Sequence, residues 1–258
     1  MKYREIKPSG FLTNFLHSFW EYETGEVDFE HTIIPDGYFD LIIEFENDAL
    51  KLVKLTGVWT TPVNVKIPRS TKIFAIRFKL LAAEYLFRQE IKSILNTTKE
   101  LSQTFLDINI YEANAFEKFA CDISNRIESS IKHLKEIDDR KLKLFDLVYS
   151  KQNLSVEELS ERVPWSSRQI NRYFNRQFGF SLKSFLNIVR CNSSYKNIAE
   201  GDLFPNENYF DQAHFIKEIK KYTGTTPSEL HKNKNVRFLQ LATKPRKYLY
   251  IINSKTDL

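Results

Sequence analysis

The sequence predicts an α+β fold, with a small β-barrel or β-sandwich in the N-terminal part and helices in most of the remainder. Two observations lead to this expectation. Residues 1–80 combine β-branched and aromatic residues in rough alternation, which is typical of strands. From residue 81 onward, apolar residues recur at helical spacing instead. Several short strands separated by turn residues indicate a sandwich or a barrel.

Five segments of the N-terminal part have the strand pattern. They are residues 16–22, 39–46, 50–60, 63–68 and 72–80. The turn residues around them are Gly25, Pro35-Asp36-Gly37, Asn47-Asp48, Pro62 and Pro68. Trp20, Trp59 and the many Phe could line a ligand pocket in this domain, although aromatic side chains in a small β domain more often form its core.

Two segments after the strands have helical spacing, residues 81–95 and 112–137. The second could form a dimer interface, and packing against the β domain explains it equally well. Its apolar face consists of Phe116, Phe119, Ile123, Ile127 and Ile131. A charged stretch then marks a boundary near residue 138. We therefore expect a β-rich domain at 1–100, a helical linker at 101–137, a second domain at 138–235 and a tail with strand-like pieces at 236–258.

Charge is distributed unevenly along the chain. Residues 1–140 contain 18 Lys and Arg against 22 Asp and Glu, a net charge of −4. Residues 141–258 contain 20 against 11, a net charge of +9. A basic C-terminal part indicates a polyanionic partner, and a solvated basic surface is the alternative.

Composition argues against several classes of protein. No apolar run approaches the roughly 18 residues of a membrane span, and no signal-peptide pattern follows the first residues. Cys121 and Cys191 lie far apart in the sequence and are not spaced like metal ligands. A reducing cytoplasm is therefore the expected location. The His residues are scattered and the Gly residues form no phosphate loop. We therefore expect no metal, no cofactor and no membrane partner.

Residues 154–186 contain two short amphipathic helices joined by a tight turn, followed by a third helix. The residues expected to cap or end them are Ser155, Glu158, Pro164, Ser166 or Ser167, Gly179 and Ser181. The second helix buries Ile170, Phe174 and Phe178 and places Arg and Asn outward. This pattern predicts a helix-turn-helix, because Arg can bind guanine and Asn can bind adenine through paired hydrogen bonds. A helical bundle with a polar face is the alternative.

A second helix of this kind lies in the segment YFDQAHFIKEIKKYTGTTPSEL, residues 209–230. Asp211 caps it, and Phe215, Ile219 and Tyr222 form its apolar stripe. We expect Gln212, His214 and Lys217 on the outer side. Gly224 stops the helix, and Thr226 and Pro227 open a final short helix.

The segments SSRQINRYFNRQFG and YFDQAHFIKEIKKYTGTTPSEL resemble the two recognition-helix segments of the AraC/XylS transcription regulators. The second follows the family signature in the order aromatic, Asp-Gln, His-Phe, Lys, Gly and Thr-Pro. The resemblance covers about residues 140–235. More loosely, IPDGYFDLIIEF, GVWTTP and AIRFKL resemble the β-rich domain of some of these regulators. The family implies two helix-turn-helix subdomains joined by a long helix at about 181–199, in a sequence-specific transcription regulator that is not an enzyme.

The resemblance also implies which residues contact double-stranded DNA. Base contacts would fall to Arg168, Asn171, Arg172, Gln212, Ala213, His214 and Lys217. Phosphate contacts would fall to Ser167, Asn175, Arg176, Lys183, Lys220 and Lys221. The domain at 1–100 would regulate or sense, through a small-molecule effector or a protein partner. RNA polymerase and a second copy of the chain, in a homodimer, are further partners that the family implies.

The chain departs from the family pattern in two places. Pro164 stands in the first turn, where the family usually has Gly, so this turn must be built differently. Between Ala199 and Asp211 the family usually has a supporting helix, whereas EGDLFPNENYF can hold about one turn at most. We therefore expect a truncated helix or a loop there.

Two other classes of protein stay open on the sequence alone. The chain could be a protein-interaction module whose shortened second helix-turn-helix no longer reads DNA. It could also be an enzyme, with a carboxylate pair for acid–base chemistry among Glu44, Glu46 and Asp48. Alternating acids on an edge strand are more often simply solvated, and no nucleophile–base pattern accompanies them.

Overall fold

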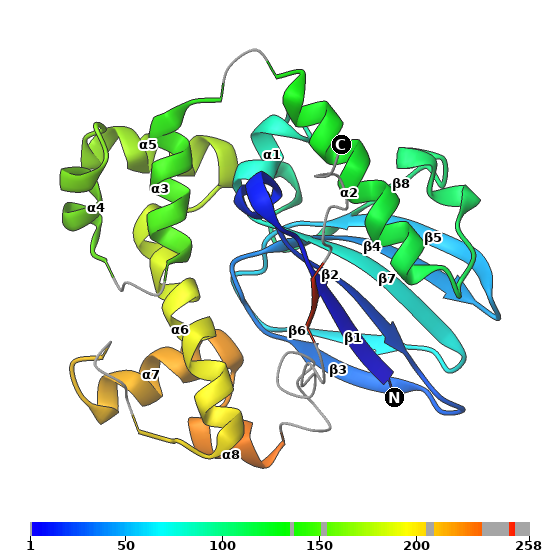
Figure 1. Ribbon diagram of the computed structural model, residues 1–258. Helices are drawn as coiled ribbons and strands as arrows, with labels where there is room; N and C mark the ends of the chain where they lie inside the picture. The colour runs from blue at the N-terminus through cyan, green and yellow to red at the C-terminus, as the bar shows by residue number, and fades with distance from the viewer. Residues whose placement is uncertain (1, 135–136, 151–153, 205–208, 234–247, 251–258) are drawn as a thin grey trace.

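The computed structural model describes residues 2–134, 137–150, 154–204, 209–233 and 248–250 of the 258-residue chain. Strands make up most of the N-terminal part and helices most of the rest (Figure 1). The prediction of a β-rich part followed by a helical part is confirmed. Among these residues no helix is both long enough and apolar enough to cross a membrane.

The N-terminal part contains a seven-stranded sheet, in the order β8-β5-β4-β7-β2-β1-β9, and a two-stranded sheet of β3 and β6. Neighbouring strands are antiparallel except β1 and β9, which are parallel. The strands are β1 (Lys2–Lys7), β2 (Leu16–Glu23), β3 (Phe29–Ile33), β4 (Phe39–Glu46), β5 (Ala49–Thr56), β6 (Val63–Ile67), β7 (Thr71–Phe78), β8 (Thr98–Leu101) and β9 (Tyr248–Tyr250).

All five expected strands are present, although β5 ends at Thr56, earlier than predicted. Strands β1, β3 and β8 were not expected. Among the described residues the large sheet has two edge strands, β8 and β9, and does not close into a barrel. β9 is the described part of the strand-like tail, and the other residues after Asn233 lie outside the described ranges.

Helix α2 (Phe116–Lys132) lies across one face of the large sheet (Figure 1). Its predicted apolar face is buried throughout. The Phe119 ring lies 6.1 Å from that of Phe19, and the Phe116 ring lies 5.2 Å from that of Phe74. On the opposite face, Trp20 and Tyr22 form a smaller cluster with residues of β6. These aromatic residues thus serve as core.

Residues 81–95 do not form the continuous helix that their spacing predicted. Helix α1 covers only Leu81–Tyr85, and a 3₁₀ turn, η2, follows at Lys92–Ile94. Between them Arg88 has a positive φ of 52°. The Phe87 ring packs 5.0 Å from that of Phe78 and 5.6 Å from that of Phe39. Packing against the sheet therefore overrides the local helical pattern. Two more 3₁₀ segments are η1 (Gly10–Asn14) and η3 (Phe105–Ile110).

The C-terminal part is helical. Its helices are α3 (Asp139–Tyr149), α4 (Val156–Arg162), α5 (Ser167–Phe178), α6 (Leu182–Glu200), α7 (Gln212–Thr223) and α8 (Pro227–Lys232). Helices α4 to α8 begin at the predicted capping residues, and α5 and α7 end at the predicted Gly. Capping boxes open α4, α5 and α8, and Ser166 caps α5. Gly179 and Gly224 end α5 and α7 with φ values of 83° and 76°, which only Gly adopts at little cost.

Both departures from the family pattern have a structural counterpart. The turn around Pro164 places Val163 and Ser166 in extended conformations, so it needs no positive φ. Helix α6 ends at Glu200, and residues 201–204 and 209–211 are not helical. The loop prediction is confirmed for these residues, and residues 205–208 lie outside the described ranges.

The sheet and the first helices of the C-terminal part share one hydrophobic core. It runs without interruption from Phe39 and Phe78 of the sheet to Phe174 and Phe185 of α5 and α6. A second, smaller core surrounds α6, α7 and α8 and includes Ile34 of the N-terminal part.

The loop 35–37 joins the sheet to the helices through its backbone. The carbonyl of Pro35 accepts a hydrogen bond from the Tyr195 hydroxyl at 3.0 Å, and that of Gly37 accepts one from the Tyr149 hydroxyl at 2.9 Å. Burial raises the pKa of Asp36 to about 6, although the Arg77 guanidinium lies 3.5 Å away and opposes the shift. The loop therefore connects a buried charge cluster with the long helix α6.

Candidate nucleic-acid interface

Helix α5 presents a row of three arginines to solvent. Arg168, Arg172 and Arg176 are spaced by four residues, so they lie along one face of the helix. All three are exposed, and the helix contains no acidic residue. Arg168 and Arg172 have no hydrogen bond or ion pair with any described residue. These two side chains are free to contact an external anion or a base edge.

Two asparagines of α5 make hydrogen bonds within the protein. Asn171 is half-buried, its amide donates to the Ser167 carbonyl at 3.1 Å, and its Oδ1 accepts from the Leu182 backbone N–H at 3.3 Å. The Asn175 amide donates to the Asn171 carbonyl at 2.8 Å. The outward position expected for Asn171 is therefore wrong in this structure. Asn171 ties α5 to the start of α6, because its side chain is within reach of an uncapped N–H group.

The C-terminal end of α5 is docked on the N-terminal part. The Gln177 amide donates to the Gln89 carbonyl at 2.9 Å, and the Ile91 N–H donates to the Gln177 carbonyl at 3.1 Å. Beside them, Arg176 Nε lies 3.2 Å from a carboxylate oxygen of Glu90. Arg176 is 80% exposed, but it already has an acidic partner in the chain.

Helix α7 presents a second polar face. The Asp211 carboxylate accepts from the His214 N–H at 2.7 Å, which fixes the start of the helix. Gln212, Ala213, Lys217 and Lys220 are exposed. Lys221 is also exposed, but its ammonium lies 4.9 Å from the centre of the Tyr222 ring. The stripe of Phe215, Ile219 and Tyr222 is buried, as predicted.

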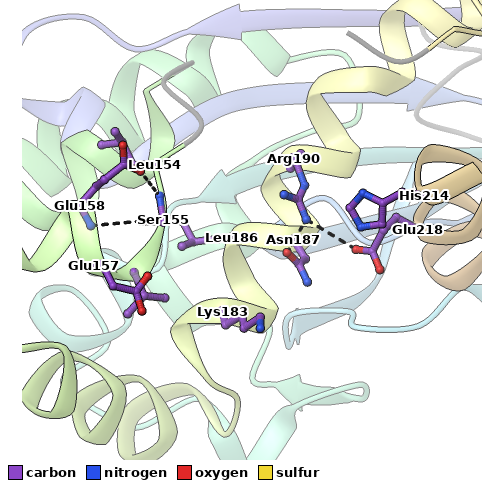
Figure 2. Close-up of a pocket in the computed structure, with 11 residues that line it drawn as sticks. Leu154, Ser155, Glu157, Glu158, Lys183, Leu186, Asn187, Arg190, His214 and Glu218 are labelled. Atoms are coloured by element: carbon purple, nitrogen blue, oxygen red, sulfur yellow. Dashed lines mark hydrogen bonds and ion pairs between the residues drawn. The ribbon is translucent and has the colours of Figure 1, made fainter. Parts of the chain in front are cut away.

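A cleft of about 580 Å³ separates α4 from α7, with α6 as its floor (Figure 2). The capping box of Ser155 and Glu158 forms one wall, and His214 and Glu218 of α7 form the other. His214 is thus half-buried and faces the cleft, which corrects the expectation that it lies on the outer side. Its ring packs against that of Tyr209, 5.8 Å away, and this contact turns it inward.

Arg190 organises the floor of this cleft. Its Nη2 donates to Asn187 Oδ1 at 2.6 Å and lies 3.7 Å from Glu218 Oε2. The guanidinium also lies 5.3 Å from the centre of the Tyr209 ring. Arg190 Nε, His214 Nδ1 and Glu218 Oε2 are buried without a hydrogen bond to any described residue. Buried polar atoms usually have a partner, so these three atoms are exceptions to the general rule.

Acid–base catalysis gains no support from the acidic strand β4. Glu44 pairs with Lys54, and Glu46 pairs with Lys51 at 2.9 Å across the β4–β5 hairpin. Such cross-strand pairs are a usual feature of exposed antiparallel strands. Among the described residues, no group of three or more His, Cys, Asp or Glu could hold a metal ion.

The sequence alone did not point to three residues of this region: Glu90, Arg190 and Phe210. The ion-pair partners of Glu90 and Arg190 lie far away along the chain, so no local sequence pattern indicates these contacts. Phe210 stands just before the Asp211 cap, where an apolar residue usually packs against the helix. In the structure its side chain is 93% exposed instead.

Comparison with known proteins gives limited information. A family described as a domain of unknown function (DUF6597) matches residues 4–100. No curated protein matches the chain. Among solved structures, ToxT from Vibrio cholerae is similar with a TM-score of 0.40 and 13% identity, over 83% of this chain and 98% of ToxT. A second ToxT structure, bound to (E)-4-(8-methylnaphthalen-1-yl)but-3-enoic acid, has a TM-score of 0.39 and 12% identity, over 90% and 97%. At TM-scores and identities this low, the likeness supports no conclusion about this chain.

Proposed function

We propose that the protein is a sequence-specific DNA-binding transcription regulator that reads two neighbouring segments of the major groove with α5 and α7. The observation that carries the proposal is the pair of 12-residue helices, each capped at its start, ended by Gly and basic on its exposed side. A helix of this size fits the major groove, and free cationic side chains neutralise the flanking phosphates.

The length of α6 suits this function. The helix has 19 residues, so it is about 28 Å long at 1.5 Å per residue. It joins α5 to α7 (Figure 1). Successive major-groove segments on one face of DNA lie about 34 Å apart. An α6 of this length could hold α5 and α7 at a separation of the right order for consecutive grooves, which supports the proposal.

The side chains proposed to contact DNA divide into two groups. Arg168 and Arg172 of α5 and Gln212, Ala213 and Lys217 of α7 are the proposed base contacts. Ser167, Asn175, Lys183 and Lys220 are the proposed phosphate contacts, joined by Arg176 and Lys221 when they leave Glu90 and Tyr222. Asn171 and His214 have a positioning role in this proposal, because their side chains are engaged between helices.

The N-terminal part would regulate DNA binding through the contacts that it makes with α5 and α6. The signal could be a small-molecule effector or a protein partner, and a second copy of the chain and RNA polymerase are further partners of such a regulator. In this proposal the signal acts on the loops 35–37 and 89–91, since both lie against the helical part.

The test is selection of binding sites from random duplexes with the full chain, followed by fluorescence anisotropy on the selected site and on a scrambled duplex. We expect a recurring sequence, a preference of at least about 10³ over the scrambled duplex and a steep fall in affinity with salt. A pool that returns no recurring sequence would contradict the proposal and favour a protein-interaction module. Arg69→Ala, which removes an exposed charge from the N-terminal part, serves as the control for Arg172→Ala.

A further inference from the structure

Helix α7 has an apolar edge on the side proposed to face DNA. Phe210 is 93% exposed and Ile216 is 36% exposed. Ala213 is also exposed and lies between them in the sequence. Ala213 and Ile216 are three residues apart, so they share a side of the helix, and Phe210 stands just before its cap. These three residues form what we term the apolar edge of α7.

The position of Phe210 is not explained by the packing of its own helix. An apolar residue just before a cap usually packs against the first turn of the helix. Here Tyr209 takes that place, with its ring 4.9 Å from that of Phe215 and its hydroxyl 3.3 Å from Ser194 Oγ. Tyr209 is buried, whereas Phe210 points away. The protein therefore leaves a whole phenyl ring in water, which forgoes the stabilisation that burial would provide.

The charges around the apolar edge indicate what covers it. Lys217 and Lys220 lie on the exposed side of α7 and have no acidic partner among the described residues. Glu218 of the same helix faces the cleft instead, beside Arg190. The nearby acid at the start of the helix, Asp211, uses a carboxylate oxygen to cap it. An apolar edge bordered by lysines is complementary to a surface with small apolar groups between rows of negative charge.

The major groove of DNA is such a surface wherever it contains thymine, because the thymine methyl is the apolar group that a base pair presents there. We propose that the apolar edge of α7, with Phe210 as its main residue, contacts thymine methyl groups, so that the half-site read by α7 contains thymine at one or two fixed positions. This inference rests on the proposed function. It adds thymine as a recognised base and Phe210 as the residue that contacts it. Phe210 would select by apolar contact, and Gln212 and Lys217 by hydrogen bonds.

The experiment removes the methyl group without altering base pairing. Deoxyuridine replaces each thymine of the selected site in turn, and fluorescence anisotropy gives the affinity of the full chain for each duplex. Burial of one methyl group corresponds to about a fourfold change in affinity. We expect a loss of this size at one or two positions of the α7 half-site. For Phe210→Ala we expect a weaker affinity for the thymine duplex and no further loss with deoxyuridine.

Two controls accompany the variant. Phe11→Ala removes another exposed phenyl ring, 47% exposed in the N-terminal part, and should behave as the unaltered protein. Thermal unfolding of Phe210→Ala should match that of the unaltered protein, since the ring packs against little.

The possible outcomes separate this inference from the proposed function. Selection without any recurring sequence overturns both. A recurring sequence whose thymines can all be replaced at no cost overturns the inference alone. Equal losses by Phe210→Ala on the thymine and deoxyuridine duplexes also overturn it, because the ring would then stabilise binding without contacting the methyl. Unchanged DNA affinity in Phe210→Ala would overturn it as well, because the ring would then take no part in DNA binding.

Discussion

The α5–α6 pair and the α7–α8 pair have the same local plan but different surroundings. In each, a capped helix of 12 residues ends at a left-handed Gly and is followed by another capped helix. The α5 end is bonded to the loop 89–91, and its apolar stripe belongs to the core that the sheet shares. The stripe of α7 belongs to a smaller core, and the described residues before α7, 201–204 and 209–211, are not helical.

This difference shows that two helix pairs can share the same local sequence signals and still be held in the fold differently. We call the pair that contains α5 the first unit and the pair that contains α7 the second unit. The first unit is built into the N-terminal part, so a signal in the sheet can reach α5 through direct contacts. The second unit is joined mainly through α6 and the loop around Ile34 and Pro35. In the proposed function, its exposed surface, which includes the apolar edge, is the part of this pair that contacts DNA.

The largest expected effect comes from removing a buried ring from each of the two cores and comparing the loss of stability. Phe174→Ala should destabilise the whole protein by about 3–5 kcal/mol, because the ring is fully buried in the shared core. Phe215→Ala should lower the stability of α7 and α8 more than that of the sheet. Hydrogen exchange measured by mass spectrometry distinguishes these outcomes. Equal loss of protection in the sheet for both variants would show that the two cores unfold as one.

A second prediction tests whether α5 reads bases. Arg172→Ala should cost about 1–3 kcal/mol of binding free energy and relax the preference at one base position, since an Arg can contact guanine with two hydrogen bonds. Lys220→Ala of α7 should weaken binding to all sequences alike and reduce the salt dependence. Binding-site selection with each variant provides the measurement. A uniform loss from Arg172→Ala would place this side chain on a phosphate.

The two left-handed glycines offer a matched pair. Both Gly179→Ala and Gly224→Ala place a side chain at positive φ, at a cost of about 1–2 kcal/mol each. The new Cβ at 179 would also lie 3.2 Å from Lys92 Cβ, whereas at 224 the nearest atom is Pro62 Cγ at 3.7 Å. Chemical denaturation should therefore show the larger loss for Gly179→Ala. Equal losses would mean that the loop bearing Lys92 yields without cost.

The smallest expected effect concerns the contact between the N-terminal part and α5. Glu90→Gln should raise DNA affinity by up to about fivefold, because it releases Arg176 from an exposed ion pair worth at most about 1 kcal/mol. Anisotropy on the selected site measures the change. In an Arg176→Ala background the same substitution should have no effect. A gain that persists there would come from removing negative charge near the DNA and not from freeing Arg176.

Much of the helical part could be predicted because its signals are local. A Ser, Asp or Thr cap, a Gly stop and an apolar stripe act between residues at most four positions apart, so the boundaries of α4 to α8 follow from the letters themselves. The five predicted strands likewise rest on a local pattern, the alternation of residue types along each segment. The continuous helix predicted for residues 81–95 was wrong, because the helical spacing there competes with the packing of Phe87 against the sheet.

By itself, then, the sequence determined the order of strands and helices, their caps and stops, and the basic character of the helical part. Only the tertiary structure decided that Asn171 and His214 turn inward, that Glu90 lies beside Arg176, and that Phe210 is left in solvent while Tyr209 is buried. The reason is physical. A side chain faces the partner that the rest of the fold brings near it, and these partners lie on other elements, often many positions away along the chain.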